Sequence, residues 1–410
     1  MDWREQSYPD WMEPKDIYRS QVLSTNVVHY RTYRILVQMA TEIGTSPAKW
    51  TRVARRVKQG LHEHVWRAVD GRYAGSRYGR TDLSQTPRAE ALGAALAILS
   101  GVTDEERAAQ VAENHPVVPF GVPSFWPYIP DIPPYHNAGI WPFVTSYWTW
   151  ASATANNTPG VEHGLASIYR AAALFLTNKE NMVAQTGHFE GTQINSDRQL
   201  WSVAGTLATV YRVFFGLRVT ADGLRLDPFV PKSYSGTRTL EGVSYRDATL
   251  DLTMKGHGTR IVQVTLDGEA LDEPVIPGDL DGQHNVRIVL SGSVPGGEMN
   301  LVAHRYTLPT PDVQLDGGDL TWEPADDASA YRIVRNGTVI DTTLRTRYAI
   351  SADTALAEYQ VQAVDERGLR SFRSEPVRVV AETGEQTVQP EGPLESKEGG
   401  YTGDGYLPIS

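Results

Sequence analysis

The sequence predicts a multidomain chain that is helical first and β afterwards. Apolar residues recur at helical spacing through about the first 215 residues. From Gly216 onward the pattern changes to short alternating runs punctuated by glycine and aspartate, which is typical of antiparallel sheets. With 410 residues, the chain is long enough for several domains that each bury a core of their own.

Seven helices are predicted before Gly216. They cover residues 25–43, 46–65, 88–99, 103–113, 140–155, 160–176 and 198–215. Gly44 ends the first, Pro47 lies in the first turn of the second, and Thr103 caps the fourth, which has acidic residues in its first turn. Because no convincing strand lies between them, we expect a layer built from helical hairpins.

Three further segments are expected after the helices. Residues 217–304 predict an antiparallel β-sandwich, with runs such as 223–228 and 286–290. Residues 305–382 predict a second β-sandwich, in which Asn336-Gly337 forms a hairpin turn and the placement of Trp322 and Tyr331 is similar to that of a fibronectin type III module. Residues 383–410 are expected to be a linker followed by the start of a truncated module that resembles a carbohydrate-binding module.

Composition excludes several classes of function. A net charge of -11 disfavours nucleic acid as a partner, because phosphates demand a basic face. The chain has no cysteine, which excludes disulfides, thiolate zinc sites and cysteine nucleophiles. Neither a Gly-x-Ser-x-Gly elbow nor a phosphate-binding glycine loop nor a His-Glu-x-x-His zinc motif is present. We therefore expect no metal and no cofactor, and no membrane span is expected because no apolar run approaches about 20 residues.

Two motifs place carboxylates among aromatic and polar residues. One is Asp2-Trp3-Arg4-Glu5-Gln6 and the other is His188-Phe189-Glu190-Gly191. Glycoside hydrolysis needs one carboxyl group to protonate the leaving oxygen and another to activate water or attack the anomeric carbon. The motifs thus predict a site that cleaves sugars, with Asp2, Glu5 and Glu190 as its candidate carboxyl groups. Either Asp2 or Glu5 can be the acid of the first loop, with Asp2 binding a hydroxyl if Glu5 is the acid, and a structural role for that loop also stays open.

Aromatic residues are dense between Phe120 and Trp150, which predicts a wall for stacking sugars. Trp148 and Phe143 are expected in the core instead, since they fall inside a predicted helix. Asp10 and Asp16 are expected either to bind sugar hydroxyls or to serve in turns and caps. The residues predicted to bind substrate are Trp3, Arg4, Trp11, Tyr135, His136, Asn137, Trp141, His188 and Trp201.

The chain resembles the second half of a six-hairpin, (α/α)6-barrel glycosidase, a group that includes trehalases, processing α-glucosidases and debranching enzymes. The resemblance rests on the helical hairpins, the Gly139-Ile140-Trp141-Pro142 segment, a late Glu190 before Gln199-Leu200-Trp201-Ser202, and the attached β-sandwich. It covers residues 2–302. It implies that residues 1–216 are the C-terminal part of such a barrel, and that hydrolysis is inverting and exo-acting on an oligosaccharide or polysaccharide, with Asp2 as acid and Glu190 as base.

One departure from the family concerns the chain's first residue. The lead-in that such glycosidases carry before their acid has no counterpart, because this chain starts at that point. We therefore expect a fragment cut at both ends. The two alternatives are a lyase or phosphorylase on a similar barrel and a noncatalytic carbohydrate-binding or scaffold protein. The β modules predict a secreted, periplasmic or cell-surface bacterial protein, and the sequence does not indicate an oligomeric state.

Overall fold

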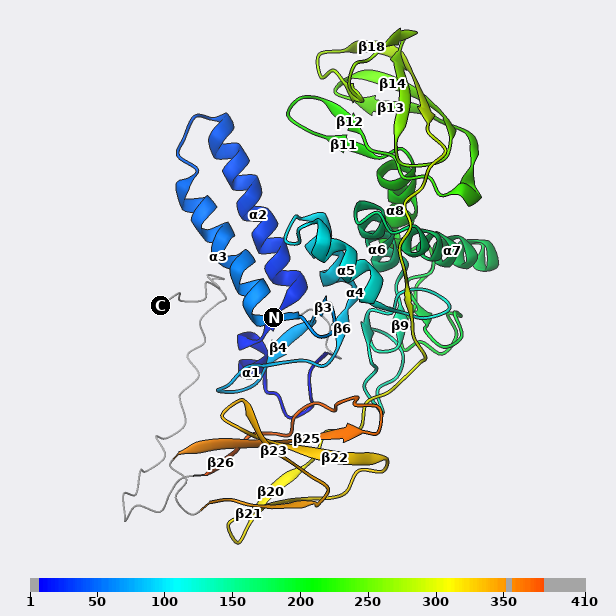
Figure 1. Ribbon diagram of the computed structural model, residues 1–410. Coiled ribbons are helices and arrows are strands. Elements are labelled where there is room, and N and C mark those ends of the chain that lie inside the picture. The colour runs from blue at the N-terminus through cyan, green and yellow to red at the C-terminus, as the bar shows by residue number, and fades with distance from the viewer. Residues whose placement is uncertain (1–6, 352–355, 380–410) are drawn as a thin grey trace, which may run out of the picture.

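The computed structural model describes residues 7–351 and 356–379 (Figure 1). Asp2, Trp3, Arg4 and Glu5 lie outside the described residues, as does the predicted linker with the start of a further module. In the described part, a layer of helices lies between two β units, one formed by residues 217–290 and the other by residues 313–379 (Figure 1).

The helices confirm the seven predicted segments to within a few residues and add a short one at the start. The helices are α1 (Pro14–Arg19), α2 (Leu23–Glu42), α3 (Ala48–His64), α4 (Ala91–Leu99), α5 (Glu105–Asn114), α6 (Pro142–Thr154), α7 (Thr158–Phe175) and α8 (Leu200–Ala208), which continues as a π-helical turn (Thr209–Phe214). Helices α2, α4, α6 and α8 lie side by side in that order, and we call them the helix row. Helices α3 and α7 fold back onto α2 and α6, respectively, as hairpin partners.

Local sequence explains where the helices begin and end. Gly44 has a φ of 71° and the Thr45 amide donates to the carbonyl of Ala40 at 2.8 Å, which closes the C-terminus of α2. Helix α5 is capped by the Asp104 carboxylate, which accepts from the Arg107 amide, and the expectation of a Thr103 cap is therefore wrong by one residue. Asn157 caps α7 by accepting from the Gly160 amide at 2.8 Å.

The expectation that no strands lie between the helices is also wrong, although the strands are too short for alternation to reveal them. They are β1 (Gln21–Val22), β2 (Trp66–Arg67), β3 (Arg72–Tyr73), β4 (Ser76–Tyr78), β5 (Ser84–Gln85), β6 (Ala89–Glu90), β7 (Pro116–Val117), β8 (Phe125–Trp126), β9 (Gly139–Ile140) and β10 (Met182–Val183). Strands β1, β6 and β9 lead into the starts of α2, α4 and α6. The loops before these helices are thereby tied together at one end of the helix row.

The β unit of residues 217–290 has two sheets. One has the order β11 (Leu217–Val219), β12 (Leu224–Leu226) and β17 (Val275–Ile276). The other has the order β13 (Gly236–Tyr245), β14 (Asp247–Gly256), β18 (Asp281–Leu290), β15 (Ile261–Leu266) and β16 (Glu269–Ala270). The expected all-antiparallel arrangement is corrected at one place, because β14 and β18 run parallel. Leu250 and Leu252 share a core with Leu165 of α7 and Phe214, which fixes this unit to the helices.

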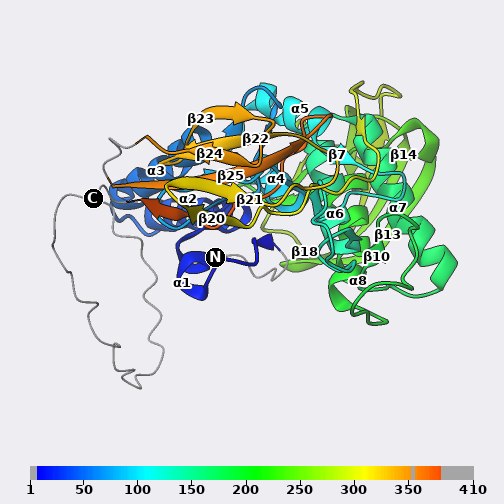
Figure 2. The same cartoon turned by 90° about the horizontal axis from the view of Figure 1, so that it is seen from below.

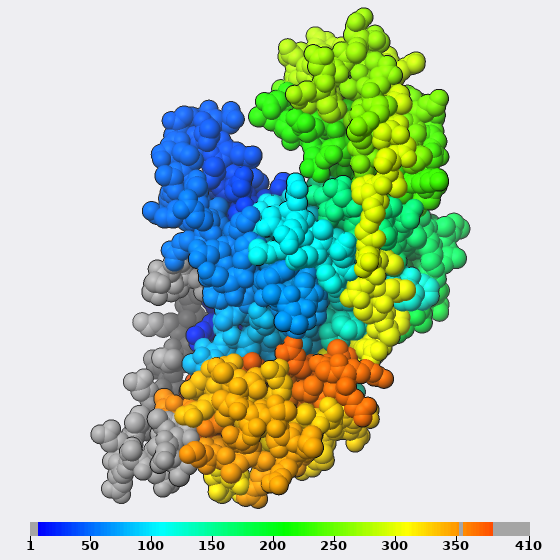
Figure 3. Space-filling model, in the orientation of Figure 1, coloured from blue at the N-terminus to red at the C-terminus, as the bar shows by residue number. Residues whose placement is uncertain are grey.

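From this unit the chain returns along the helical layer, where Figure 3 shows it as a yellow band. Strand β19 (Asn300–Leu301) pairs in parallel with β7, and Tyr306 forms a bridge with Tyr128. The chain then enters the C-terminal β unit, which has one sheet of β20 (Val313–Asp316), β21 (Asp319–Trp322) and β24 (Arg347–Ala349). The other sheet has the order β23 (Thr338–Thr343), β22 (Ala328–Arg335), β25 (Ala357–Asp365) and β26 (Val377–Val379). Trp322, Tyr331 and Tyr359 are buried between the sheets.

The C-terminal β unit is fastened to the loops before α2 and α4. The Arg373 amide donates to the Tyr78 hydroxyl at 2.9 Å, and the Trp11 indole donates to the Arg373 carbonyl at 2.8 Å. Arg80 pairs with Glu375 at 3.0 Å. Seen from below, this unit lies across the end of the helical layer near α2, α3 and α4 (Figure 2). It therefore borders the same loops that lead into the helix row.

Candidate functional site

Two loops, residues 127–141 before α6 and residues 177–199 before α8, form one connected region. Strand β9 in the first pairs with β10 in the second, and the Ala184 amide donates to the Ala138 carbonyl at 2.8 Å. The Gln193 amide donates to the Pro134 carbonyl at the same distance. Residues predicted separately from the two loops are therefore brought within one site.

A buried carboxylate lies where these loops meet. Glu180 is 8% exposed, and its Oε1 accepts a hydrogen bond from the Tyr135 hydroxyl at 3.1 Å. Its Oε2 accepts from the Ser196 hydroxyl at 2.9 Å, and its amide donates to the Ser196 carbonyl. Both carboxylate oxygens thus have a donor that fixes their direction.

The segment that carries Glu180 is anchored on both sides. The Asn195 side-chain amide donates to the Asn181 carbonyl at 2.8 Å, and that of Asn181 donates to the Ile194 carbonyl at 3.0 Å. The Ser202 hydroxyl in α8 donates to the Lys179 carbonyl at 2.9 Å. Packing and hydrogen bonds therefore hold Glu180 against the first turn of α8, which is the kind of support that a catalytic group needs.

A series of aromatic contacts runs from Glu180 to the surface. The Tyr135 and Trp141 rings meet edge to face with centroids 5.1 Å apart, Trp141 meets Phe143 at 5.9 Å, and Phe143 meets Trp201 at 4.9 Å. His136 stacks on Trp141 at 5.2 Å. Trp201 is the ring of this series nearest the surface and is 54% exposed. We call Glu180, Tyr135, Ser196 and this series of rings the Glu180 site.

Trp201 also borders an open groove of about 700 Å³ between the four members of the helix row. Apart from Arg212, its walls are uncharged, with Val28, Leu92, Phe143 and Trp150 among them. The described residues of this lining include no carboxylate, and glycosidic bond cleavage uses a pair of them. The chemistry of this region therefore belongs to the loops before the helices, and the groove supplies apolar surface beside them.

Glu190 and His188 occupy a more exposed position than the motif suggests. The Glu190 side chain is 78% exposed, and its amide donates to Nδ1 of His188 at 3.1 Å. The His188 ring packs on Phe175 and Phe189, with centroids 5.1 and 4.6 Å away, respectively. No described residue holds the Glu190 carboxylate closer than His188 Nδ1, which lies 3.9 Å from it. Its role as the base stays a prediction.

Several predicted substrate contacts are buried and make structural contacts. Asn137 is fully buried, and its side chain binds the backbone of Ile129 and Ile132, so it positions a loop. Trp141 is buried, and its indole donates to the Tyr135 carbonyl at 3.0 Å. His136 is buried beside it. Because packing buries these three side chains, Tyr135 and Trp201 are the better candidates for contact with a ligand.

Trp11 is placed elsewhere, at the junction with the C-terminal β unit, where Arg80 lies over its ring. Asp16 is buried, pairs with Arg80 at 3.2 Å and completes the capping box of α1, so the capping alternative holds for it.

The predicted aromatic wall is largely interior. Phe125 and Tyr128 belong to hydrophobic clusters, because the short strands around them turn their rings inward, and Trp148 is buried as expected.

Sequence reasoning missed Glu180. The surrounding Asn178-Lys179-Glu180-Asn181 segment carries no aromatic residue, whereas Glu190 follows a histidine and a phenylalanine. One signal in the sequence could have pointed to Glu180. It lies near the start of the long loop that connects the predicted helices 160–176 and 198–215. Only the fold shows that this glutamate is enclosed.

Among residues 7–351 and 356–379, no group of three or more histidine, aspartate or glutamate side chains is arranged to hold a metal ion. Within the same residues, none of the helices combines the length and the apolar content that crossing a membrane requires.

Comparison with known proteins gives only distant likenesses. No family model and no curated protein sequence matches the chain. Among solved structures, GH63 mannosylglycerate hydrolase from Thermus thermophilus in complex with glucose is 19% identical, with a TM-score of 0.38 and coverage of 48% of this chain and 47% of that one. An uncharacterized conserved protein from the same organism is 18% identical, with a TM-score of 0.39 and coverage of 48% and 51%.

A GH78 family rhamnosidase of Bacillus sp. GL1 is 16% identical, with a TM-score of 0.38 and coverage of 69% of this chain and 28% of that one. Neutral trehalase from Saccharomyces cerevisiae is 12% identical, with a TM-score of 0.34 and coverage of 46% and 37%. The chain spans about half the length of the first structures that it matches. At these TM-scores the likenesses are too weak to support a function, which has to be inferred from the site.

Proposed function

We propose that the chain is part of a glycoside hydrolase and that Glu180 is one carboxylate of its catalytic pair. The observation that carries the proposal is the enclosed Glu180 carboxylate, oriented by the hydroxyls of Tyr135 and Ser196 and connected to the exposed Trp201 by rings that meet edge to face. A fixed carboxylate beside a ring that can stack on a sugar is the combination that glycosidic bond cleavage uses.

The geometry leaves Glu180 able to act. An ionised carboxylate offers roughly four lone-pair positions, and Tyr135 and Ser196 use two of them. The remaining positions can accept a proton from water or a hydrogen bond from a sugar hydroxyl. In an inverting, exo-acting reaction Glu180 would serve as the base and Asp2 or Glu5 as the acid, and those two residues lie outside the described ones. Glu190 stays the alternative base.

The remaining expectations are proposals of the same kind. The order of three and four strands in the two sheets of the C-terminal β unit supports a fibronectin type III-like module, and the hairpins of the helix row support part of an (α/α)6 barrel. A secreted, periplasmic or cell-surface place in a bacterium is likewise proposed, since such a modular layout is typical of exported polysaccharide-degrading enzymes. The buried, hydroxyl-bound Glu180 favours hydrolysis over noncatalytic carbohydrate binding, since a stacking platform alone needs no enclosed carboxylate.

The test is to incubate the full chain with a panel of aryl glycosides and polysaccharides and to follow the released sugar by proton NMR. We expect release of a monosaccharide whose first-formed anomer is inverted. Binding of an oligosaccharide without release, measured by calorimetry on the same samples, would replace the hydrolase with the noncatalytic alternative. Unsaturated products or sugar phosphates would indicate the lyase or the phosphorylase.

A further inference from the structure

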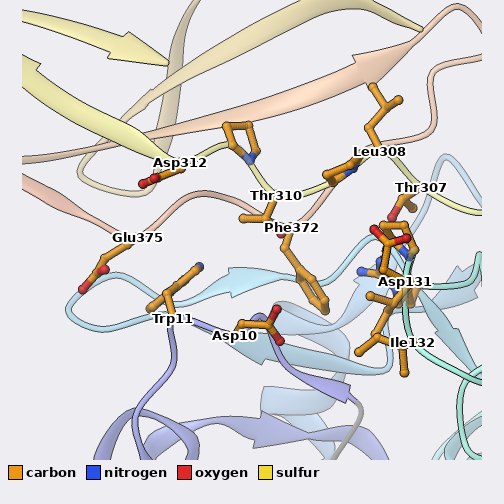
Figure 4. A pocket seen from close by; sticks show the side chains of 15 residues that line it. Asp10, Trp11, Asp131, Ile132, Thr307, Leu308, Thr310, Asp312, Phe372 and Glu375 are labelled. Carbon is orange, nitrogen blue, oxygen red and sulfur yellow. The ribbon is translucent and has the colours of Figure 1, made fainter. Parts of the chain in front are cut away.

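A pocket of about 400 Å³ lies between the helical layer and the C-terminal β unit, away from the Glu180 site. Figure 4 shows its walls, to which Asp10 and Trp11 contribute from the N-terminal loop and Phe372 and Glu375 from the C-terminal β unit. Asp131 and Asp312 complete a rim of carboxyl groups around it. We call this the interface pocket.

The interface pocket contains a buried arginine with unused donors. Arg88 is 3% exposed, and its Nη2 donates to the Thr307 hydroxyl at 2.9 Å. Its guanidinium lies 4.0 Å from the centroid of the Phe372 ring, and both Thr307 and Phe372 line the pocket. Its Nε and Nη1 have no hydrogen-bond partner among the described residues. Buried polar groups are nearly always hydrogen-bonded, so the two unused donors of this pocket-lining arginine favour an acceptor that the described residues do not supply.

The layout of charges decides what kind of acceptor fits. Nε and Nη1 do not share an edge of the guanidinium plane, so a single carboxylate or phosphate does not accept from both. The exposed carboxylates of Asp10, Asp131 and Asp312 also repel anions from the rim. Those carboxylates accept hydrogen bonds from hydroxyl groups, while the arginine donates to hydroxyl or ring oxygens. A neutral, polyhydroxylated ligand satisfies both halves of the pocket.

We propose that the interface pocket binds a neutral oligosaccharide, with Arg88 donating from the floor and aspartates of the rim accepting from its hydroxyls. The choice of a saccharide among neutral polyols rests on the proposed function. In this proposal the C-terminal β unit helps to bind the substrate, because Phe372, Asp312 and Glu375 lie in or next to that unit and not in the helical layer.

The test measures binding of maltohexaose, cellohexaose, xylohexaose and mannohexaose to the full chain by calorimetry. The key variants are Arg88→Lys, which keeps the charge but removes the planar set of donors, and Asp312→Ala, which alters only the rim. Asp312 is exposed, so its replacement leaves the fold intact even if the Arg88 variant does not fold. Asp247→Ala, an exposed aspartate on β14 in the other β unit, is the matched control.

We expect at least one of these hexasaccharides to bind, with affinity reduced about tenfold or more by Asp312→Ala and by Arg88→Lys and unchanged by Asp247→Ala. Glu180→Gln should abolish hydrolysis while this binding persists, which separates the pocket from the catalytic proposal. Binding that neither pocket variant weakens, no binding of any of the four probes, or a preference for a glucuronate trimer over all of them would overturn the proposal.

Discussion

The Tyr135 hydroxyl donates to Oε1 of Glu180 at 3.1 Å, across 45 residues of sequence. The contact joins the loop before α6 to the loop before α8, and it makes the orientation of the Glu180 carboxylate depend on both. Because Tyr135 also packs on His136 and Trp141, the hydroxyl is held in place by the rings around it.

Replacing Tyr135 with phenylalanine should slow hydrolysis while leaving the fold intact. The ring contacts remain, but one donor to the carboxylate is lost, and a hydrogen bond to a charged group is worth about 1.5–3 kcal/mol. We expect kcat/KM to fall roughly ten- to a hundredfold by steady-state kinetics. The control is Tyr18→Phe, at a hydroxyl on the exposed face of α1. Equal rates for the two variants would mean that Tyr135 does not orient a catalytic group.

His115 should make the protein sensitive to mild acid. It is buried against Trp148, and burial, with a smaller effect of the Arg72 charge, lowers its pKa from 6.5 to about 3. The folded state therefore keeps His115 neutral while the unfolded chain takes up a proton below pH 6.5. Its contribution to stability is complete above pH 6.5 and is lost progressively as the pH falls toward 3.

The check is urea denaturation at pH 7 and pH 5.5. Between these values the wild type should lose about 1 kcal/mol more unfolding free energy than His115→Gln, which cannot be protonated. His29→Gln, on the exposed face of α2, should lose as much as the wild type. A His115→Gln variant that loses stability in parallel with the wild type would show that this histidine is not the titrating group.

Arg80 is expected to be the main electrostatic link between the N-terminal loop and the C-terminal β unit. It pairs with Asp16, which is 2% exposed, and with Glu375. Arg80→Ala leaves the Asp16 carboxylate buried without its cation, which should cost about 3 kcal/mol of unfolding free energy. Lys15→Ala, which removes the exposed pair with Glu13, should cost under about 1 kcal/mol. Chemical denaturation of both variants compares them, and similar losses would count against the buried pair.

Most of the fold could be predicted from the sequence, because the signals for its helices and turns are local. Gly44 ends α2 with a left-handed backbone, Asn157 caps α7, and Asn336-Gly337 lies at the turn between β22 and β23, so periodicity and turn chemistry sufficed for these elements. The two-residue strands before the helices escaped prediction because an alternating pattern needs more residues than they have. The parallel pairing of β14 with β18 joins residues 34 positions apart, such as Asp247 and Asp281, and no local signal specifies it.

The site was predicted less well, because burial is a property of the fold and not of a motif. Glu190 stands among aromatic residues in the sequence but points its carboxylate outward, whereas Glu180 has polar neighbours in the sequence and rings near it only in space. Tyr135 and Trp201 were predicted as substrate contacts because aromatic residues in the loops and first turns near helices are visible in the sequence, and that role stays a prediction. Asn137 was predicted to contact substrate, whereas its side-chain amide makes hydrogen bonds with the backbone of its own loop.

The most direct test of the account compares the hydrolysis rates of the wild type, Glu180→Gln and Glu190→Gln on the substrate that the glycoside panel identifies. Circular dichroism would confirm that all three are folded. We expect Glu180→Gln to lower kcat by about a hundredfold to ten-thousandfold, the usual worth of a positioned acid or base, and Glu190→Gln to stay within a fewfold of the wild type. Retained activity in Glu180→Gln together with its loss in Glu190→Gln would contradict the assignment and return the base to the exposed loop.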